Sequence, residues 1–385
     1  MVEALARRYP PDLAESWDAV GLVCGEPERA VRRVLFAVDP VARVVDEAIA
    51  WGADLVVTHH PLLLRPVHSV AATSATGVVL TRLVQAGVGL YCAHTNADIA
   101  NPGVSDALAD AVGLSGPRAP LARRPGPPLD TIVTFVPEGD AEALIDALSA
   151  AGAGALGDYT RCAWTVSGTG TFTPQHGAHP TIGTVGAAAH VVEARVEMVL
   201  PRARRAEVVA ALRAAHPYEE PAFDVLELVD VPARPGHDLG LGRVGMLPAP
   251  MTLATLAERV AAVLPLGAGG VRVAGDPDLP VRRLAVCGGA GDSLLDAARE
   301  VGADAYLTAD LRHHPALAAR EGVDHAPALL DAGHWSTEWP WLPVAAEALR
   351  ADLDRLGSTV EVRVSRLCTD PWSGHRPANT QGAPH

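Results

Sequence analysis

The chain has 385 residues, of which 49% are hydrophobic, and its formal net charge is −14. This length exceeds what a single hydrophobic core supports, so two or more domains are expected. No apolar run reaches the roughly 20 residues of a membrane-spanning helix, and the acidic balance disfavours nucleic acid as a partner.

Residues 1–128 predict the first half of an α/β core domain. The N-terminal segment MVEALARRYPPDL lacks the apolar stretch of a secretory signal, so we expect a cytoplasmic protein. The strand VRRVLFAVD, the helix PVARVVDEAIAWG and the strand ADLVVTHHP predict a βαβ unit. The helix TGVVLTRLVQAG and the strand VGLYCAHTNAD follow. Because ligands gather beyond the carboxyl ends of such strands, HH and HTNAD are expected to meet in one crevice.

Residues 129–235 predict a separate inserted domain that begins after the proline-rich connection GPRAPLARRPGPP. Two helical segments, GDAEALIDALSAAGAG and RARRAEVVAALRAAH, alternate with strands. This order predicts a small α+β domain of the split βαβ, ferredoxin-like kind.

Residues 236–372 predict a return to the α/β pattern and the second half of the core domain. The alternating segments are the helix TLATLAERVAAVLP, strand RRLAVCGG, helix DSLLDAARE, strand ADAYLTAD, helix HPALAAREG, strand APALLDAGH and helix WPWLPVAAEALRADLDRLG. The last segment, residues 373–385, has no periodicity and is predicted to be a disordered tail.

The strand-end histidines are the first candidates for metal ligands. Taken alone, His59 and His60 are ambiguous, because neighbouring side chains on a strand point to opposite faces and one ring often satisfies a backbone carbonyl. At the end of a strand, however, the backbone can turn both rings into one cavity. Asp98, just past another strand, adds a carboxylate at an equivalent position of the sheet.

A third motif, GHWSTE, supplies His334 and Glu338. If a helix begins near Ser336, the two side chains are four residues apart and reach one site. A glutamate in a first helical turn often only complements the helix dipole. Together, however, the three strand ends supply a mixed nitrogen and oxygen set of ligands that suits zinc, iron or manganese.

Two other kinds of site are excluded by composition. The five cysteines form no CxxC pair, and the absence of lysine excludes a phosphate-loop lysine or a Schiff base.

The chain resembles the Nif-three-like dinuclear metal-centre family, also named GTP cyclohydrolase I type 2 homologues. The motifs that carry the resemblance recur in order along the chain: ESWDAVGL, DLVVTHHPLL, LYCAHTNAD, AVCGGAGDSLL, ADAYLTADLRHH, LLDAGHWSTE and CTDPW. The resemblance implies a core of two βαβ-type halves around a metal cleft. The segments AGAGALGDY, GTGTFTP and HPYEEPAFDV are similar to the insert of longer bacterial members, which implies a PII/CutA-like inserted domain.

The resemblance also implies two divalent metal ions per subunit. By this resemblance His60 and Asp98 are expected to hold one ion and His59 and His334 the other, with Glu338 bridging both as the candidate catalytic residue. Two ions roughly 3.5–4 Å apart activate a bridging water and neutralise charge on a phosphate. A metal-dependent hydrolase of a nucleotide or another phosphorylated small molecule is therefore the leading hypothesis. The reaction that the family's name suggests is opening of the guanine ring of GTP.

The alternative is a non-catalytic metal-binding protein with a regulatory or partner-binding role. The resemblance implies a homohexameric ring, a trimer of dimers, without a membrane or nucleic-acid partner. Asp310 is expected to form hydrogen bonds behind the ligands, and Ala309 departs from the glycine usual before it. The glycine run at 287–293 is expected to pack tightly near the metal cleft. HPYEEP at 216–221 is expected to form a structural turn, with a weak second metal site as the alternative.

Overall fold

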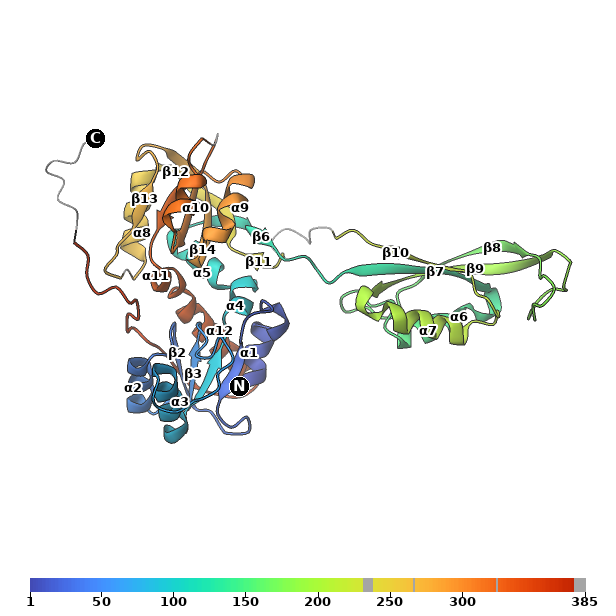
Figure 1. Ribbon diagram of the computed structural model, residues 1–385, viewed down its shortest axis with the longest axis horizontal. Coiled ribbons are helices and arrows are strands. Elements are labelled where there is room, and N and C mark those ends of the chain that lie inside the picture. Colours follow the sequence, from blue (N-terminus) through green and yellow to red (C-terminus); the bar gives the residue numbers. More distant parts are fainter. Residues whose placement is uncertain (231–237, 266, 323–324, 377–385) are drawn as a thin grey trace. The chain divides into compact units, whose positions relative to one another are not determined.

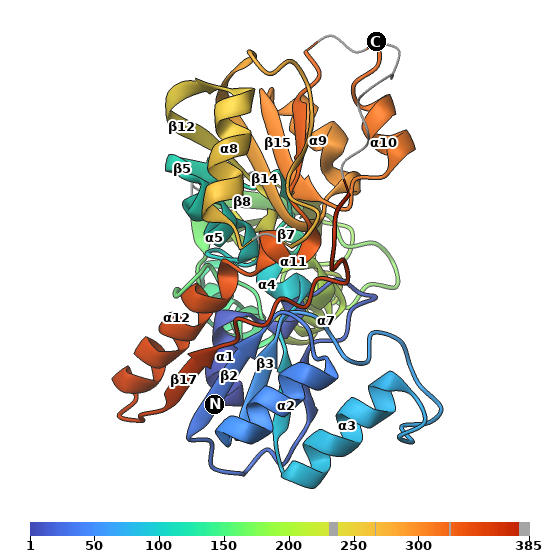
Figure 2. The same cartoon turned by 90° about the vertical axis from the view of Figure 1, so that its left-hand side faces the viewer.

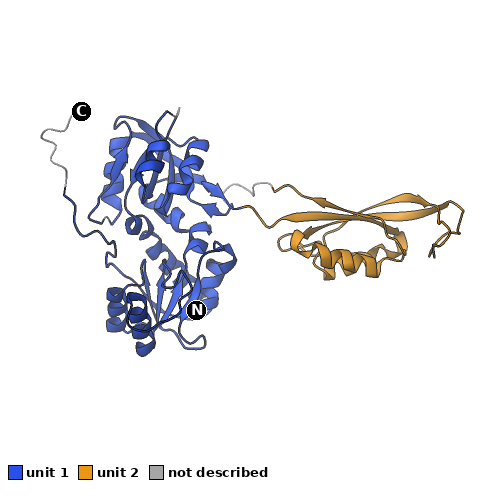
Figure 3. Cartoon of the chain, viewed as in Figure 1, with its two compact units in different colours: residues 1–124, 233–385 blue, residues 125–232 orange. Residues whose placement is uncertain are grey.

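The computed structural model describes residues 1–230, 238–265, 267–322 and 325–376. These residues divide into two compact units, one formed by 1–124 with 233–385 and the other by 125–232, coloured blue and orange in Figure 3. The predicted boundary at residue 235 lies outside the described residues, and so does the part of the predicted tail 373–385 that follows residue 376.

The first sheet of the first unit follows the predicted βαβ pattern. Its strands run in the order β1-β4-β3-β2-β17, with β17, β2, β3 and β4 parallel and β1 antiparallel. The predicted strands and helices are confirmed, whereas the two edge strands β1 and β17 were not predicted. The bounds are β1 Gly21–Cys24, β2 Arg33–Ala37, β3 Leu55–Thr58, β4 Gly89–Cys92, β17 Glu361–Val364, α1 Val2–Arg8, η1 Pro11–Leu13, α2 Ala42–Trp51 and α3 Ala75–Ala86.

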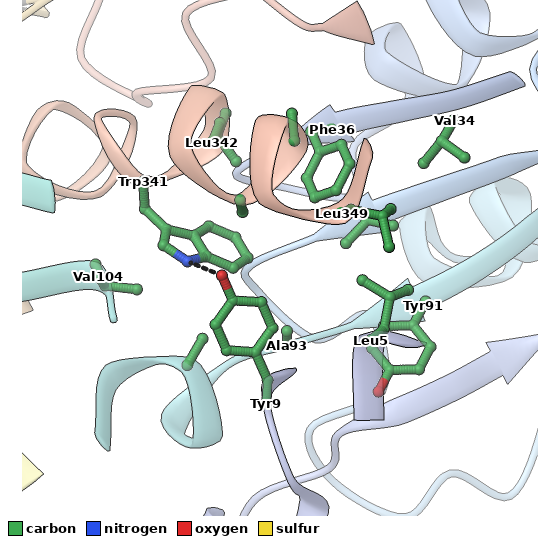
Figure 4. Close-up of a cluster of buried hydrophobic side chains, with 14 of the residues drawn as sticks. Leu5, Tyr9, Val34, Phe36, Tyr91, Ala93, Val104, Trp341, Leu342 and Leu349 are labelled. Atoms are coloured by element: carbon green, nitrogen blue, oxygen red, sulfur yellow. Dashed lines mark hydrogen bonds between the residues drawn. The ribbon is translucent and has the colours of Figure 1, made fainter. Parts of the chain in front are cut away.

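Both faces of this sheet are covered because alternate side chains of β2 point to opposite sides. Val34 and Phe36 pack with α1 and α12 (Trp341–Arg355), whereas Leu35 packs with α2 and α3. Figure 4 shows the first of these clusters, in which the indole of Trp341 donates a 3.0 Å hydrogen bond to Tyr9 Oη. The cluster fixes the helix that follows the GHWSTE motif against the strands that carry His59 and His60.

Capping residues set where the helices beside the first sheet begin and end. Ser74 caps α3 by accepting a hydrogen bond from the backbone N–H of Gly77. Gly52 and Gly87 end α2 and α3 in the left-handed conformation, with φ of 75° and 66°. These stops return the chain to the sheet, so that the next strand runs parallel to the preceding one.

The second sheet of the unit has the strand order β13-β16-β15-β14-β12-β5, with β14, β15 and β16 parallel. The parallel strands were predicted, and the antiparallel strands β5, β12 and β13 were not. The bounds are β5 Ser115–Ala119, β12 Arg243–Thr252, β13 Arg272–Ala274, β14 Pro280–Ala290, β15 Ala305–Ala309, β16 Ala328–Asp331, α8 Leu253–Val263, η4 Asp292–Leu294, α9 Leu295–Glu300 and α10 His313–Ala318. A separate two-stranded sheet pairs β6 Ala122–Arg123, which follows β5 in the chain, with β11 Gly240–Leu241, which precedes β12.

Three helices lie between the two sheets in both views: α4 (Thr95–Ile99), α5 (Val104–Val112) and α11 (His334–Glu338) (Figures 1 and 2). α4 follows β4 of the first sheet, and α11 follows β16 of the second. The carboxyl ends of parallel strands from both sheets therefore open toward the same central layer.

The second unit has the element order β7-α6-β8-β9-α7-β10 and an antiparallel sheet with the strand order β10-β7-β9-β8. This order is that of the split βαβ arrangement. The core forms between α6, α7 and one face of the sheet, around Ile132, Leu144, Val196 and Leu212. The bounds are β7 Leu129–Pro137, η2 Glu138–Asp140, α6 Ala141–Ala150, β8 Trp164–Phe172, β9 Ala189–Pro201, η3 Arg202–Arg204, α7 Arg205–Ala215 and β10 Phe223–Glu227.

A buried arginine ties the central layer to the second sheet. Arg243 on β12 is 2% exposed, and its guanidinium lies 2.9 Å from Asp106 Oδ1 on α5 and 2.6 Å from the carbonyl of Ala100. Two further hydrogen bonds reach the carbonyls of Gly240 and Gly242. Because the guanidinium and the Asp106 carboxylate are both buried, removal of the Arg243 side chain would leave that carboxylate without a positive partner.

We therefore expect Arg243→Met to lower the free energy of unfolding by about 3–5 kcal/mol, because breaking a buried ion pair strands the remaining charge. Chemical denaturation of the purified variants measures this change. The matched control is Arg33→Met, whose exposed pair with Glu361 contributes at most about 1 kcal/mol. Equal losses in the two variants would contradict the structural role given to Arg243.

Candidate metal centre

Both strand-end histidines turn toward one place. The backbone N–H groups of His59 and His60 still pair with the end of β2 and the residue after it, through the carbonyls of Ala37 and Val38. The hydroxyl of Thr58 then donates to the carbonyl of His60, which bends the chain directly after β3. The two ring centroids lie 5.1 Å apart, so the alternation of side chains along the strand has ended at this point.

Asp98 reaches the same place from α4, which is separated from the end of β4 at Cys92 by only Ala93 and His94. Its Oδ1 lies 3.7 Å from His59 Nε2. His94, at the start of α4, also enters the group, because its ring centroid is 5.2 Å from that of His59.

The GHWSTE motif differs from the prediction in one detail. The helix α11 begins at His334 and not near Ser336, because Gly333 adopts φ 83° and turns the chain immediately after β16. Glu338 is therefore the last residue of this short helix, not a member of the first turn. The spacing of four residues still holds, and His334 Nε2 lies 3.0 Å from Glu338 Oε1.

All five predicted site residues lie together around the carboxylate of Glu338, which is 3% exposed. Its Oε1 lies 3.4 Å from His59 Nε2, and its Oε2 lies 3.1 Å from His60 Nε2. His60 Nε2 and His334 Nε2 are 3.2 Å apart. The ligand-type atoms of His60, His334 and Glu338, and separately those of His59, His60 and His94, are close enough to hold a cation.

The nearest pairs divide the cluster differently from the division that the resemblance implies. Asp98 approaches His59, and His334 approaches His60. The assignment of His60 with Asp98 to one ion, and of His59 with His334 to the other, stays a prediction.

Two buried polar atoms in the cluster have no hydrogen-bond partner among the described residues: His59 Nε2 and Glu338 Oε2. Buried polar atoms are otherwise almost always paired, because an unpaired one is costly. The Nδ1–H of His59 donates to the carbonyl of Ala93 at 2.9 Å, so in the neutral ring Nε2 carries a free lone pair. An orphaned imidazole lone pair beside an orphaned carboxylate oxygen is the donor set that a divalent cation satisfies.

The remaining histidines are held from behind by carboxylates. Asp39 Oδ1 lies 2.7 Å from His60 Nδ1, Asp310 Oδ2 lies 2.8 Å from His334 Nδ1, and Asp18 Oδ1 lies 2.8 Å from His94 Nδ1. Such partners fix the ring orientation and leave Nε2 facing the cluster. The supporting role expected of Asp310 matches this geometry, and its φ of 56° is reached with Ala309 before it.

Sequence reasoning missed Asp39 and Asp18 as partners of the histidines. Asp39 follows β2 in the same way that His59 follows β3, so the strand-end argument itself could have found it. Asp18 lies in no regular element and gives no comparable signal; its side chain is fully buried and also accepts the backbone N–H of Thr95.

The electrostatics follow from this crowding of carboxylates. Burial opposes the charged form of His60, yet the charges of Glu338 and Asp39 outweigh burial and raise its pKa to about 10. Burial is likewise outweighed at His334, where Glu338 and Asp310 raise the pKa to about 11. Burial also opposes ionisation of Glu338, but the surrounding imidazoles hold its pKa well below the usual range. Without a metal ion, protons neutralise the cluster.

The glycine run at the end of β14 explains how Glu338 fits. A Cβ at Gly289 would lie 2.3 Å from Glu338 Oε1 and 3.1 Å from His334 Nε2, and Gly289 also has φ 69°. A Cβ at Gly291 would lie 2.0 Å from Thr308 Oγ1. These contacts support tight packing near the cleft as the reason for the glycines.

A cavity of about 920 Å³ borders the cluster. His60, His94 and His334 line it, together with Asp39 and Asp310. Its outer wall comes from the segment that contains the late CTDPW motif and from the glycine-rich stretch near Gly267. The cluster is therefore reachable by a small molecule.

Comparison with known proteins gives a consistent result. The family model for Duf34/NIF3 (NGG1p interacting factor 3) matches residues 1–371. A Mycobacterium tuberculosis protein named "GTP cyclohydrolase 1 type 2 homolog" is 51% identical over 378 residues, which cover 97% of this chain and 96% of that protein.

Solved structures of similar proteins cover the same length. A Bacillus cereus protein related to NIF3 is 36% identical with a TM-score of 0.68 and covers 96% of this chain and 97% of its own. The Staphylococcus aureus protein SA1388 is 27% identical with a TM-score of 0.78 and covers 97% of both chains. No helix among the described residues is long and apolar enough to cross a membrane.

The raised histidine pKa values predict opposite pH responses with and without metal. In the metal-free protein, the raised pKa of His60 contributes stability that is complete below its ordinary value of 6.5 and is lost as the pH rises toward 10. Metal ligation needs neutral imidazoles, so metal affinity rises over the same range. The melting temperature of chelator-treated protein should fall from pH 6.5 upward, while the increase caused by added Mn²⁺ should grow. A pH-independent increase would contradict the proton–metal exchange.

Proposed function

This chain belongs to the Duf34/NIF3 family, and from that membership we propose that the cluster around Glu338 holds two divalent metal ions and hydrolyses a nucleotide or another phosphorylated small molecule. The observation that carries the proposal is the pair of orphaned buried atoms, His59 Nε2 and Glu338 Oε2, at the centre of an imidazole and carboxylate cluster. Stable burial of both atoms needs positive charge, from protonated imidazoles or from a bound cation, and we propose the cation.

The position of Glu338 supports a bridging role. One carboxylate oxygen faces His59 and His334, and the other faces His60. His59, His60, Asp98 and His334 are the further ligands that we propose, with zinc, iron or manganese as the ions. Few protein ligands for each ion leave positions for water and substrate, as in catalytic sites.

The chemistry divides between the ions and the chain. When bound, two ions lower the pKa of a water and neutralise charge on a phosphate. Asp39 and Asp310 hold the rings of His60 and His334 with Nε2 toward the cluster. The buried carboxylate of Glu338 remains ionised beside the imidazoles, so it is available as a ligand at neutral pH.

The cavity beside the cluster supports a nucleotide-sized substrate. At about 920 Å³ it is large enough for such a molecule. Trp372, 73% exposed, offers an indole face on its wall, and Arg272 offers a guanidinium. Because curated relatives bear the name "GTP cyclohydrolase 1 type 2 homolog", GTP is the first substrate to test.

We further propose that residues 129–235 form a PII/CutA-like domain inserted into a core made of 1–128 and 236–372. The βαββαβ element order of the second unit supports this assignment. With it we propose a homohexamer, a trimer of dimers, in which the insert mediates assembly. Mass measurement in solution tests the oligomer independently of the reaction.

The hydrolase proposal predicts that Glu338→Gln loses at least one ion and at least about a hundredfold in turnover, because the bridging charge disappears while the shape is kept. Elemental analysis and hydrolysis of GTP and simpler phosphoesters by the metal-loaded protein measure the two effects. The control is Glu347→Gln, which removes the same charge from an exposed position of α12.

Two results distinguish the alternatives. Turnover unchanged by Glu338→Gln would exclude this cluster as the catalytic site. Metal lost together with no turnover of any phosphoester by the wild-type protein would favour the alternative, a metal-binding protein with a regulatory or partner-binding role.

A further inference from the structure

The second unit contains a cavity that the proposed hydrolase does not use. It has a volume of about 630 Å³ and is lined only by residues between 135 and 222. Strands β8 and β9 form its floor, and the loop after β8 forms a wall. This loop is fastened to the HPYEEP segment, because the N–H of His179 donates to Glu219 Oε2 at 2.9 Å and the hydroxyl of Thr181 donates to the carbonyl of Pro217 at 2.6 Å.

A buried carboxylate lines this cavity without a charge partner. Glu193 on β9 is only 8% exposed. Tyr218 Oη donates a 2.7 Å hydrogen bond to its Oε1. Among the described residues, no side chain forms an ion pair with Glu193 or a hydrogen bond with its Oε2. Burial of a carboxylate without a positive partner is unfavourable, so a bound group of positive charge would stabilise this cavity.

One glycine of β8 makes room for the carboxylate, and a second lies beside open space. A Cβ at Gly170 would lie 1.9 Å from Glu193 Oε2, so any other residue would displace the carboxylate. Gly168 is paired across the strands with Glu193, and a Cβ there would meet nothing within 4 Å. Glycine within a strand costs stability and often marks a close approach by a ligand or another backbone. The glycine at position 170 of β8 is explained by this close approach of the carboxylate.

The one arginine in the lining does not compensate Glu193. Arg195 Nε lies 2.7 Å from Glu197 Oε1, and its guanidinium lies over the ring of Phe135 at 6.0 Å from the centroid. Glu219 and Glu220 add two more carboxylates to the lining. The charge that faces the cavity is therefore negative.

The rest of the lining combines hydroxyl side chains of β8 and the loop after it, such as Ser167 and Thr171, with apolar and aromatic side chains. Phe172 and Tyr218 pack edge to face with ring centroids 5.7 Å apart. Val166, Pro174 and Ile182 complete the apolar wall. Burial, and secondly the bonded Glu193, raise the pKa of Tyr218 far above its usual range, so the phenol stays protonated and keeps donating. Aromatic faces beside a carboxylate attract organic cations rather than anions.

We propose that this cavity binds a small organic cation, a protonated amine with an aromatic or apolar body, whose ammonium group pairs with Glu193. The described residues of the second unit form no group of three or more metal-ligating side chains, which argues against a metal ion as the occupant. His216 of the HPYEEP motif is engaged in a turn, where its Nε2 lies 3.0 Å from the carbonyl of Phe135 and its Nδ1 accepts the N–H of Tyr218.

The test uses the full chain and three probes that carry a phenyl ring on a two-carbon chain and differ in charge. They are 2-phenylethylammonium, neutral 2-phenylethanol and anionic 3-phenylpropionate. Ligand-observed NMR titration should give the ammonium the highest affinity and the alcohol an affinity at least roughly tenfold lower, because only the ammonium pairs with the buried carboxylate. Glu193→Gln should lower the ammonium affinity at least roughly tenfold, since glutamine still accepts from Tyr218 but carries no charge.

Two further variants separate charge from space. Glu207→Gln removes an exposed carboxylate of α7 and should leave the affinity unchanged. Gly168→Val fills open space in the floor without altering charge and should weaken the ammonium and the alcohol together. The proposal is overturned if wild-type protein does not bind the ammonium, if the alcohol binds equally well, or if Glu193→Gln binds like Glu207→Gln.

Discussion

The structure of the first unit depends on one electrostatic constraint: a fully enclosed glutamate must be neutralised by groups that arrive from two different sheets. Glu338 comes from α11, which follows β16 of the second sheet, whereas His59 and His60 directly follow β3 of the first. The buried ion pair between Arg243 and Asp106 and the Trp341 cluster hold these layers together. Either protons or metal ions satisfy the carboxylate, and the geometry accommodates both.

Preorganisation extends outward from the ligands. Each of His60, His94 and His334 is fixed by a carboxylate on its far nitrogen, and His59 by a backbone carbonyl. Gly289 removes the one Cβ that would displace Glu338. Such support is what a metal site requires for affinity, because the ligands need no rearrangement when the ion arrives.

The strands and site residues that could be predicted from the sequence are those with periodic apolar residues or with polar residues directly after a strand. Parallel strands with apolar runs, such as β3 and β15, and the histidines after β3 follow from patterns a few residues long. Short edge strands such as β13 and β17 have weak patterns and form only because a neighbouring strand offers its edge. Asp18, held in place by His94 and Thr95 from far along the chain, depends on tertiary contacts that no local pattern contains. The start of α11 was misplaced because Gly333 was not recognised as the residue that turns the chain.

The central claim is that the side chains around Glu338 hold two metal ions, and anomalous diffraction from crystals of Zn²⁺-loaded protein measures this most directly. We expect two peaks that share Glu338, each about 2.0–2.2 Å from its oxygen and histidine nitrogen ligands. Peaks only elsewhere in the chain, or a single peak that does not contact Glu338, would contradict it.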